Sequence, residues 1–207
     1  MSPRRYDMKD RKASIESTRR RILDATVKLH GERGIFGTSW QDIAAAADVS
    51  VGTVYKHFPS INELVPACGD LLMERIQPPR PEDAEEIIGD AKRPAERLAK
   101  VANTLFEFYE RGGAHLDADL RERELPMVKE WEDYLRAMVA HFVRVALSEL
   151  APGERQTRAI GALFDFPSFR AMRARGITPA DAAVQAVEMA VLWIEAQSNT
   201  SKQEERP

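Results

Sequence analysis

The chain has 207 residues, of which 43% are hydrophobic and 30% are charged, so it is long enough to bury a sizeable core as one large or two small domains. Its formal net charge is −3, and no apolar run approaches the roughly 18 residues that a membrane-spanning helix needs. The single cysteine, Cys68, excludes an internal disulfide and a site built from several thiolates of one chain, and we interpret it as a small buried residue rather than a redox sensor.

The chain begins with a polar segment followed by an amphipathic helix. Residues 1–13 hold five cations against two carboxylates and lack the apolar stretch of a secretory signal, so we predict a flexible basic arm. A first helix is predicted from Ile15 to Arg33, because Gly34 is a typical helix-ending residue. Its inward positions are Ile22, Leu23, Thr26 and Leu29, and Arg19, Arg20 and Arg21 lie near its start.

Residues 38–58 have the pattern of two short helices joined by a tight turn. Thr38 or Ser39 can cap the first helix, because a hydroxyl accepts from the free N–H groups of a first turn, and Ser50 can cap the second in the same way. The inward positions of the first helix, at i, i+3, i+4 and i+7, are Trp40, Ile43, Ala44 and Ala47. Those of the second helix are Val51, Val54 and Phe58.

The second of these helices has an open face that suits DNA. A glycine, a hydroxyl, a phenol, a cation and an imidazole within six residues can approach phosphates and base edges closely, and a helix–turn–helix places this helix in the major groove. The alternative is the solvated face of an ordinary helical hairpin. The residues we predict to contact DNA are Thr38, Ser39, Trp40, Ser50, Gly52, Thr53, Tyr55, Lys56 and His57.

The same stretch resembles the DNA-binding signature of the TetR family of bacterial transcription regulators. The family pattern has Thr near the start of a helix and Ile-Ala in its middle, followed by Ala-x-Val-Ser-x-Gly-x-x-Tyr-x-His-Phe, which runs here from Ala47 to Phe58. The next family positions, Ser-Lys and Glu-Leu, have Ile61 in place of the lysine, while Ser60 and Glu63 are predicted to form a capping box. The resemblance covers about residues 14–65 and implies a dimeric repressor with a C-terminal ligand-binding domain.

The charge is divided unevenly along the chain. Residues 1–65 hold 11 Lys and Arg against 8 Asp and Glu, a net charge of +3, whereas residues 66–207 hold 19 against 25, a net charge of −6. This asymmetry fits a basic module on an acidic body. For the arm at residues 1–13 two interpretations stay open, a plain disordered terminus or an arm that reaches the minor groove.

The rest of the chain is predicted to be helical. The predicted segments are a connecting helix Glu63–Gln77, a short acidic helix near Glu82–Ala91, a long helix from Pro94 to Gly112, a short charged helix Asp117–Glu124, the longest helix Pro126–Leu150, a helix Arg155–Arg175 with a break near Pro167, and a final helix from Thr178 to about Gln197. We therefore predict an all-α fold. It comprises an N-terminal three-helix helix–turn–helix domain over residues 1–62, the connecting helix over residues 63–77, and a C-terminal helical ligand-binding and dimerisation domain over residues 78–207.

The final helix predicts a homodimer. It is apolar around most of its circumference, with Asp181, Gln185, Glu188 and Glu195 in one narrow stripe, so it needs cover on more than one side. The alternative is the central core helix of a monomer. With the preceding helix it would form an intermolecular four-helix bundle, which the family resemblance also implies, and the predicted interface residues are Ile160, Leu163, Phe164, Val187, Val191 and Ile194.

Aromatic residues of the C-terminal part are candidates for an effector pocket. Most of them are expected to be core, but the resemblance implies a ligand cavity lined by such residues with a few polar groups. The predicted lining residues are Phe106, Tyr109, Trp131, Tyr134, Met138 and His141. The effector would be a small apolar or aromatic molecule.

Catalysis is the rival class of function. The four histidines lack a second ligand at metal-binding spacing, and the chain has neither a glycine-rich phosphate loop nor a nucleophile elbow, so we expect no catalytic residue, no metal and no cofactor. A second rival is a regulator or architectural factor of the same fold that a protein partner controls, and a cavity filled by side chains would support it. The expected partners are operator DNA and a second copy, with no membrane, in the cytoplasm and on the nucleoid.

Overall fold

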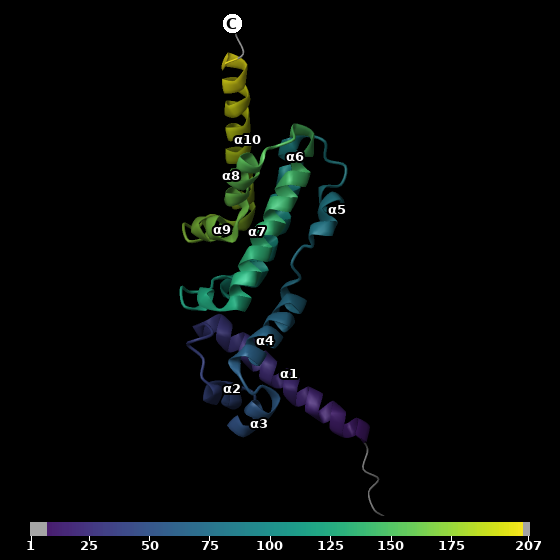
Figure 1. Ribbon diagram of the computed structural model, residues 1–207, viewed down its shortest axis with the longest axis vertical. Helices are drawn as coiled ribbons and strands as arrows, with labels where there is room; N and C mark the ends of the chain where they lie inside the picture. The colour runs from purple at the N-terminus through teal and green to yellow at the C-terminus, as the bar shows by residue number, and fades with distance from the viewer. Residues whose placement is uncertain (1–7, 205–207) are drawn as a thin grey trace, which may run out of the picture. The chain divides into compact units, whose positions relative to one another are not determined.

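The computed structural model describes residues 8–204, and their side chains between residues 11 and 197. This part of the chain is helical without any strand, so the predicted all-α class is confirmed (Figure 1). The chain divides into two compact units. Of the described residues, the first unit holds those up to Ile76 together with Asp117–Val128, and the second holds Gln77–Leu116 and those from Lys129 to residue 204.

Four helices build the first unit: α1 (Met8–Arg33), α2 (Trp40–Ala46), α3 (Val51–His57) and α4 (Ile61–Ile76). Their apolar faces meet in one core, in which the predicted inward residues Ile22, Ile43, Val54 and Phe58 are at most 2% exposed. The connecting helix was predicted to reach Gln77, but α4 ends at Ile76 because Gln77 adopts a positive φ of 46°.

The first helix begins earlier than its apolar pattern predicts. Residues 8–13 belong to α1, so the predicted flexible arm over residues 1–13 is wrong for its second half, and its first seven residues lie outside the described part of the chain. Apolar periodicity could not show this, because residues 11–17 are all exposed and bury nothing. In Figure 1 this purple end of α1 projects away from α2 and α3.

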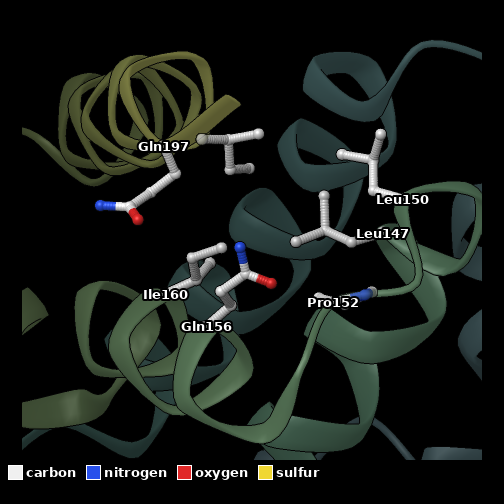
Figure 2. Close-up of a pocket in the computed structure, with 7 residues that line it drawn as sticks. Leu147, Leu150, Pro152, Gln156, Ile160 and Gln197 are labelled. Carbon is white, nitrogen blue, oxygen red and sulfur yellow. The ribbon is translucent and has the colours of Figure 1, made fainter. Parts of the chain in front are cut away.

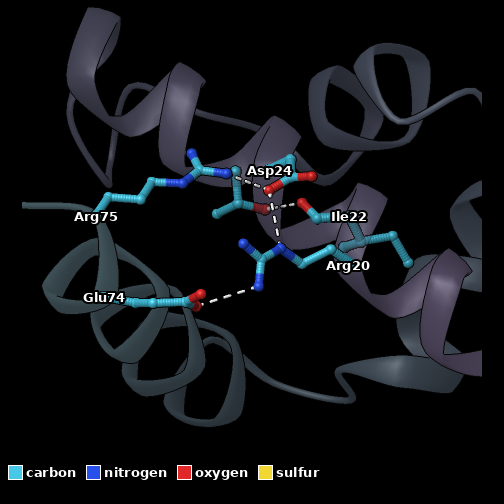
Figure 3. A network of polar contacts seen from close by, with 6 residues as sticks. Arg20, Ile22, Asp24, Glu74 and Arg75 are labelled. Atoms are coloured by element: carbon cyan, nitrogen blue, oxygen red, sulfur yellow. Dashed lines mark hydrogen bonds and ion pairs between the residues drawn. The ribbon is translucent and has the colours of Figure 1, made fainter.

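An ion-pair network joins α1 to α4 (Figure 3). Arg20 lies between Asp24 on its own helix, at 3.4 Å, and Glu74 on α4, at 3.2 Å, and Arg75 of α4 also donates to Asp24. All four side chains are 42–64% exposed, so each pair contributes little on its own and the network mainly orients the two helices.

Cys68 lies in the core of the first unit. It is 6% exposed, with its Sγ 3.8 Å from His30 Nδ1, and burial raises the pKa of the thiol to about 12. A thiol that stays protonated at neutral pH is a poor nucleophile. The environment is that of the small buried residue predicted from the sequence.

Residues 117–128 differ most from the prediction. A charged helix was predicted over Asp117–Glu124, but only the short 3-10 helix η3 (Glu122–Glu124) forms, and Glu122 is buried at 6% exposure. The segment also groups with the first unit, although all of residues 78–207 were assigned to the second domain. Three chain crossings therefore connect the units, after Ile76, before Asp117 and after Val128.

The second unit is built around the long helix α6 (Pro94–Gly112). Four helices pack against α6: α5 (Ala84–Ile88), α8 (Glu154–Phe164), α9 (Phe166–Arg173) and α10 (Pro179–Glu204). The 3-10 helix η1 (Pro81–Asp83) directly precedes α5. The 3-10 helix η2 (Gly113–Leu116) follows α6, and the 3-10 helix η4 (Ser148–Leu150) follows α7 (Pro126–Ala146). Helix α7 starts in the first unit and continues in the second. The predicted break near Pro167 occurs at Asp165, and α10 continues beyond the predicted end at Gln197.

The helix predicted over Pro126–Leu150 ends early because α6 caps it. Arg97 donates from Nε to the carbonyl of Ala146 at 3.0 Å and from Nη2 to that of Val145 at 2.9 Å. Its side chain is only 13% exposed, so the guanidinium satisfies carbonyls that the end of a helix leaves free. In the described part of the chain no helix is both long enough and apolar enough to cross a membrane.

Candidate nucleic-acid interface

The start of α2 is fixed by Ser39. Its hydroxyl accepts from the amide of Asp42 at 3.1 Å, and the Asp42 carboxylate accepts from the amide of Ser39 at 3.0 Å, which completes a capping box. Hydrogen bonds from Ser39 hold the pKa of the Asp42 carboxyl below its usual value. Of the two predicted caps, Thr38 is not used, because its hydroxyl donates to the carbonyl of Gly34 at 2.9 Å.

The turn between α2 and α3 has the form that the sequence predicts. Asp48 takes a positive φ of 53°, a conformation that Asp and Asn tolerate better than most residues. Ser50 then caps α3 by accepting from the amide of Thr53 at 3.1 Å, and its hydroxyl also lies 2.8 Å from the Thr53 hydroxyl. The orientation of α3 is therefore set by local hydrogen bonds at its first turn.

The face of α3 that points away from the core carries the predicted contact residues. Gly52, Tyr55 and Lys56 are exposed, and Thr53 and His57 are half-buried. Packing within the chain does not require a glycine at position 52, because a Cβ there would meet only Ser50 Oγ, at 3.8 Å. The open space over this face suits the close approach of another molecule.

An aromatic pair spans the two helices of the motif. The Trp40 ring of α2 stacks on the Tyr55 ring of α3, with centroids 4.8 Å apart and planes 28° from parallel. Tyr55 is 44% exposed, so Trp40 supports one side of its ring while much of the side chain stays accessible. Sequence periodicity assigned Trp40 to the inward face and could not indicate this contact.

The three arginines of α1 have different environments. Arg19 lies over the Phe58 ring, with its guanidinium carbon 5.0 Å from the centroid, a cation–π contact that holds the cation next to the end of α3. Arg20 is engaged with Asp24 and Glu74, whereas Arg21 is exposed. The sequence grouped the three as candidates for phosphate contacts, but only the fold shows that Arg20 has carboxylate partners.

The residues predicted to line an effector pocket have two kinds of surroundings in the second unit. Phe106 and Tyr109 of α6 are 1% exposed in an aromatic cluster with Phe164, Phe166 and Phe169. The Tyr109 hydroxyl donates to the carbonyl of Phe164 at 3.0 Å, and burial raises the pKa of this phenol. These two side chains are thus enclosed by neighbouring rings.

The predicted lining residues on α7 lie in other surroundings. Met138 is buried, His141 is half-buried, and the Trp131 and Tyr134 rings stack with centroids 5.4 Å apart. Tyr134 is 40% exposed, so this stack is accessible from outside the protomer.

A pocket of about 190 Å³ opens elsewhere in the second unit. It is lined by Leu147, Leu150, Pro152, Gln156, Ile160, Ile194 and Gln197, as Figure 2 shows for the labelled residues. Its lining comes from the segment after α7, from α8 and from α10, so it shares no residue with the predicted effector site. No signal in the sequence distinguished these residues from core or interface positions.

The predicted dimer residues are mostly covered within the protomer. Ile160 and Phe164 are at most 1% exposed, and the others, Leu163, Val187, Val191 and Ile194, are half-buried. Among the described side chains of α10, the exposed large apolar residues are instead Val184, Met189 and Leu192, at 56%, 41% and 66% exposure. They lie on the side that also carries Glu188 and Glu195, which the sequence pattern assigned to solvent.

Metal ligands were not expected. Among the described side chains, residues 11–197, His, Cys, Asp and Glu form no group of three or more that could hold a metal ion.

Comparison with known proteins points to one family. Residues 22–68, which contain α2 and α3, match the sequence model described as bacterial regulatory proteins, tetR family. Over 52 residues the chain is 44% identical to the HTH-type transcriptional repressor KstR of Mycolicibacterium smegmatis. This match spans 25% of the chain and about a quarter of KstR, 26% of its length.

Solved structures match over nearly the whole chain. A TetR-like transcriptional regulator from Rhodococcus sp. RHA1 is similar with a TM-score of 0.60 at 19% identity, over 86% of this chain and 96% of that one. The multidrug binding protein EbrR complexed with imidazole is similar with a TM-score of 0.54 at 25% identity, over 84% and 92%. The helix–turn–helix is therefore similar in sequence to that of the bacterial regulatory proteins of the tetR family, and the chain has the fold of TetR-like regulators over 86% of its length.

Proposed function

We propose that the protein is a transcriptional repressor that binds an operator in double-stranded DNA as a homodimer. The observation that carries this proposal is the outer face of α3, where Gly52, Tyr55 and Lys56 are exposed while Val54 and Phe58 anchor the helix in the core. Repression is the activity named for the relative KstR. The protein would act in the cytoplasm, on the nucleoid.

Each exposed group of α3 has a role that follows from its chemistry. Gly52 lets the backbone approach the DNA, Lys56 offers a point charge to a phosphate, and Tyr55 offers a hydroxyl on a ring that Trp40 supports. Thr53 and His57 are the candidates for hydrogen bonds to base edges in the major groove. The net charge of +3 on residues 1–65 attracts the duplex without fixing the sequence that is bound.

Dimerisation would bury the exposed apolar side of α10. Val184, Met189 and Leu192 lie on this side, and the exposed face of α8 offers the small residues Ala159 and Ala162, which allow close approach of a second copy. A four-helix bundle made from α8 and α10 of two protomers would have the two-fold symmetry that most homodimers have. The two α3 helices would then read half-sites about 34–36 Å apart, or a multiple of one DNA turn.

Release by a small apolar or aromatic effector is the second part of the proposal. It is supported by the neighbour EbrR, which is a multidrug binding protein seen with imidazole, and by the accessible stack of Trp131 and Tyr134. A ligand that stacks on this pair would favour one arrangement of α7 over others. Ten-fold weaker DNA binding would require a differential affinity of about 1.4 kcal/mol between the two arrangements.

One observation favours the second candidate function, control by a protein partner without a small ligand. Phe106, Tyr109 and Met138 are each 1% exposed, which supports a predicted effector site filled by side chains. The pocket of about 190 Å³ lies elsewhere and is smaller than the roughly 300–1,000 Å³ typical of ligand sites.

Selection of genomic fragments with the purified protein tests the proposal. We expect recovery of a small set of promoter fragments with a two-fold symmetric element, and log affinity for that element should fall linearly with log salt. Binding that ignores both sequence and salt would contradict the repressor assignment. Titration of apolar and aromatic compounds with and without the recovered element then separates the two candidates, because an effector must bind more weakly in the presence of DNA.

A further inference from the structure

Glu122 is a buried carboxylate that the DNA-contacting residues leave unexplained. It lies in the segment between α6 and α7, is 6% exposed, and belongs to the first unit although it follows Ile76 by more than forty residues. Burial of a charged group is costly unless hydrogen bonds compensate for the lost water. The partners of this carboxylate therefore indicate what it stabilises.

The two oxygens of Glu122 have different partners. Oε2 accepts from the amide of Asp119 at 3.0 Å while the Asp119 carboxylate accepts from the amide of Glu122 at 2.8 Å, a reciprocal pair of the capping-box type. Oε1 accepts from the amide of Ile35, which lies 87 residues earlier in the sequence. One oxygen thus shapes the local turn, and the other binds the loop between α1 and α2.

The loop is built to receive this carboxylate. Gly34 has a positive φ of 74°, a conformation that favours glycine, and a Cβ at this position would lie 2.7 Å from Glu122 Oε1, so any side chain here would displace the carboxylate. A second contact lies beside the first, because the Arg121 guanidinium sits over the Phe36 ring, 4.6 Å from its centroid. Two consecutive residues of the segment therefore hold two consecutive residues of the loop.

The loop determines how the helix–turn–helix is presented. It ends at the Ser39 cap of α2, and α2 packs directly against α3. A shift of the loop would therefore move α2 and α3 relative to α1, which carries Arg19 next to α3. DNA has a fixed groove geometry, so such a shift would weaken the binding made by the outer face of α3.

We propose that Glu122 is a positioning residue for DNA binding, which sets the orientation of α2 and α3 through the Ile35 amide without touching DNA. This inference rests on the proposed function. It assigns to the segment before α7 a role in operator affinity, and it adds a link from α7 to the helix–turn–helix in addition to α4.

Charge-matched variants test the proposal in the full-length protein. Glu122→Gln and Glu130→Gln each remove one negative charge, and Glu130 is an exposed residue of α7. Removal of a negative charge should strengthen binding to a polyanion slightly, as expected for Glu130→Gln. We expect Glu122→Gln to bind the recovered operator at least ten-fold more weakly, because an amide offers only one acceptor where two N–H groups converge.

The variant Glu122→Asp separates the effect of side-chain length from the effect of side-chain charge. It keeps the charge of the wild-type protein but is one methylene shorter, so it cannot span from Asp119 to Ile35, and we expect a similar loss of affinity. If Glu122→Gln fails to fold, Glu122→Asp carries the test. Fluorescence anisotropy with end-labelled operator gives both the dissociation constant and the fraction of protein that is competent to bind.

The outcomes separate positioning from mere stabilisation. A positioning role predicts a weaker dissociation constant at full stoichiometry and a smaller slope of log affinity against log salt, by about 0.9 for each phosphate that the variant no longer neutralises. Unchanged affinity and slope with only a smaller competent fraction would overturn the proposal, as would Glu122→Gln binding like Glu130→Gln. If the wild-type protein binds no duplex, the proposed function fails, and this proposal fails with it.

Discussion

At Gly52, the protein's own packing leaves room for a side chain. The nearest atom to a Cβ at this position would be Ser50 Oγ at 3.8 Å, an ordinary van der Waals distance, and the backbone there does not need a positive φ. The absence of a side chain is thus more easily explained by a molecule outside the chain than by the fold. A substitution at residue 52 can therefore test DNA binding without disturbing the fold.

Gly52→Glu should abolish operator binding while the protein stays folded and dimeric, because it places bulk and negative charge where phosphates would lie. The matched control is Gly69→Glu on α4, where a Cβ would meet nothing within 4 Å and the added charge is the same. Anisotropy titrations together with circular dichroism measure the two properties. Wild-type affinity in Gly52→Glu would remove α3 from the interface.

Tyr55 and Trp40 act as a pair, so two variants are needed to divide the contribution of Tyr55. Tyr55→Phe keeps the stacked ring and loses only the hydroxyl, whereas Tyr55→Ala also leaves the Trp40 ring without its partner. We expect Tyr55→Ala to weaken operator binding by about 1–3 kcal/mol, the scale of one good contact. If the hydroxyl touches the DNA, Tyr55→Phe will show most of this loss in the same titration, and a wild-type affinity for Tyr55→Ala would contradict the assignment.

At the scale of the elements, the junction between α8 and α9 holds a largely buried carboxyl group whose pKa is raised. Burial raises the pKa of the Asp165 carboxyl to about 6 from 3.8, against the opposing attraction of Arg136. The folded protein thus holds the proton more tightly than the unfolded chain. The stabilising contribution of this proton is complete below about pH 3.8 and is lost as the pH rises through 6.

Asp165→Asn should therefore help most at neutral pH, because the amide is uncharged at every pH. We expect the urea midpoint of the variant, relative to that of the wild type, to increase between pH 4 and pH 7. Asp90→Asn, at an exposed position, serves as the control and should show a difference that changes little with pH. A relative midpoint that falls over this range would show that the charged form of Asp165 is the favoured one in the fold.

Local signals explain why most elements could be predicted from the sequence. The hydroxyls of Ser39 and Ser50 act within four residues of their own positions, and the helix-ending Gly34 acts on its own backbone, so a short window of sequence contains the cause. Glu122 is the opposite case. In a run of charged residues it has the pattern of a solvated helix, and only its partner 87 residues away makes it a buried group.

The features of the candidate site also divide into those that local sequence predicts and those that depend on distant residues. The outer face of α3 follows from helical periodicity, so its residues could be named in advance. The stack of Trp40 on Tyr55, the pairing of Arg20 with Glu74 and the enclosure of Phe106 depend on tertiary packing that periodicity does not encode. The side of α10 that stays exposed was also not predictable, because apolar residues occur around most of that helix.

For the whole molecule, the exposed side of α10 predicts how two copies associate. Leu192→Glu should give a folded monomer, because Leu192 is 66% exposed and its replacement disturbs little within the protomer. The control is Leu120→Glu, since Leu120 is 82% exposed in the first unit. Light scattering coupled to gel filtration measures the mass, and a Leu192→Glu variant that remains a dimer would place the interface elsewhere.

The discontinuous first unit has a consequence for how the protein is made. A ribosome that has completed α1 to α4 has not yet synthesised Glu122, and the whole of Gln77–Leu116 must be translated before this carboxylate can reach Ile35. Domains generally fold as units during synthesis, from the N-terminus onward. Here the order is interrupted, because the DNA-binding unit receives its last segment, Asp117–Val128, only after Gln77–Leu116 of the other unit has been translated. A nascent chain that carries the helix–turn–helix alone thus lacks the hydrogen bond that fixes its loop, which would delay competence for the operator until the rest of the protein is being completed.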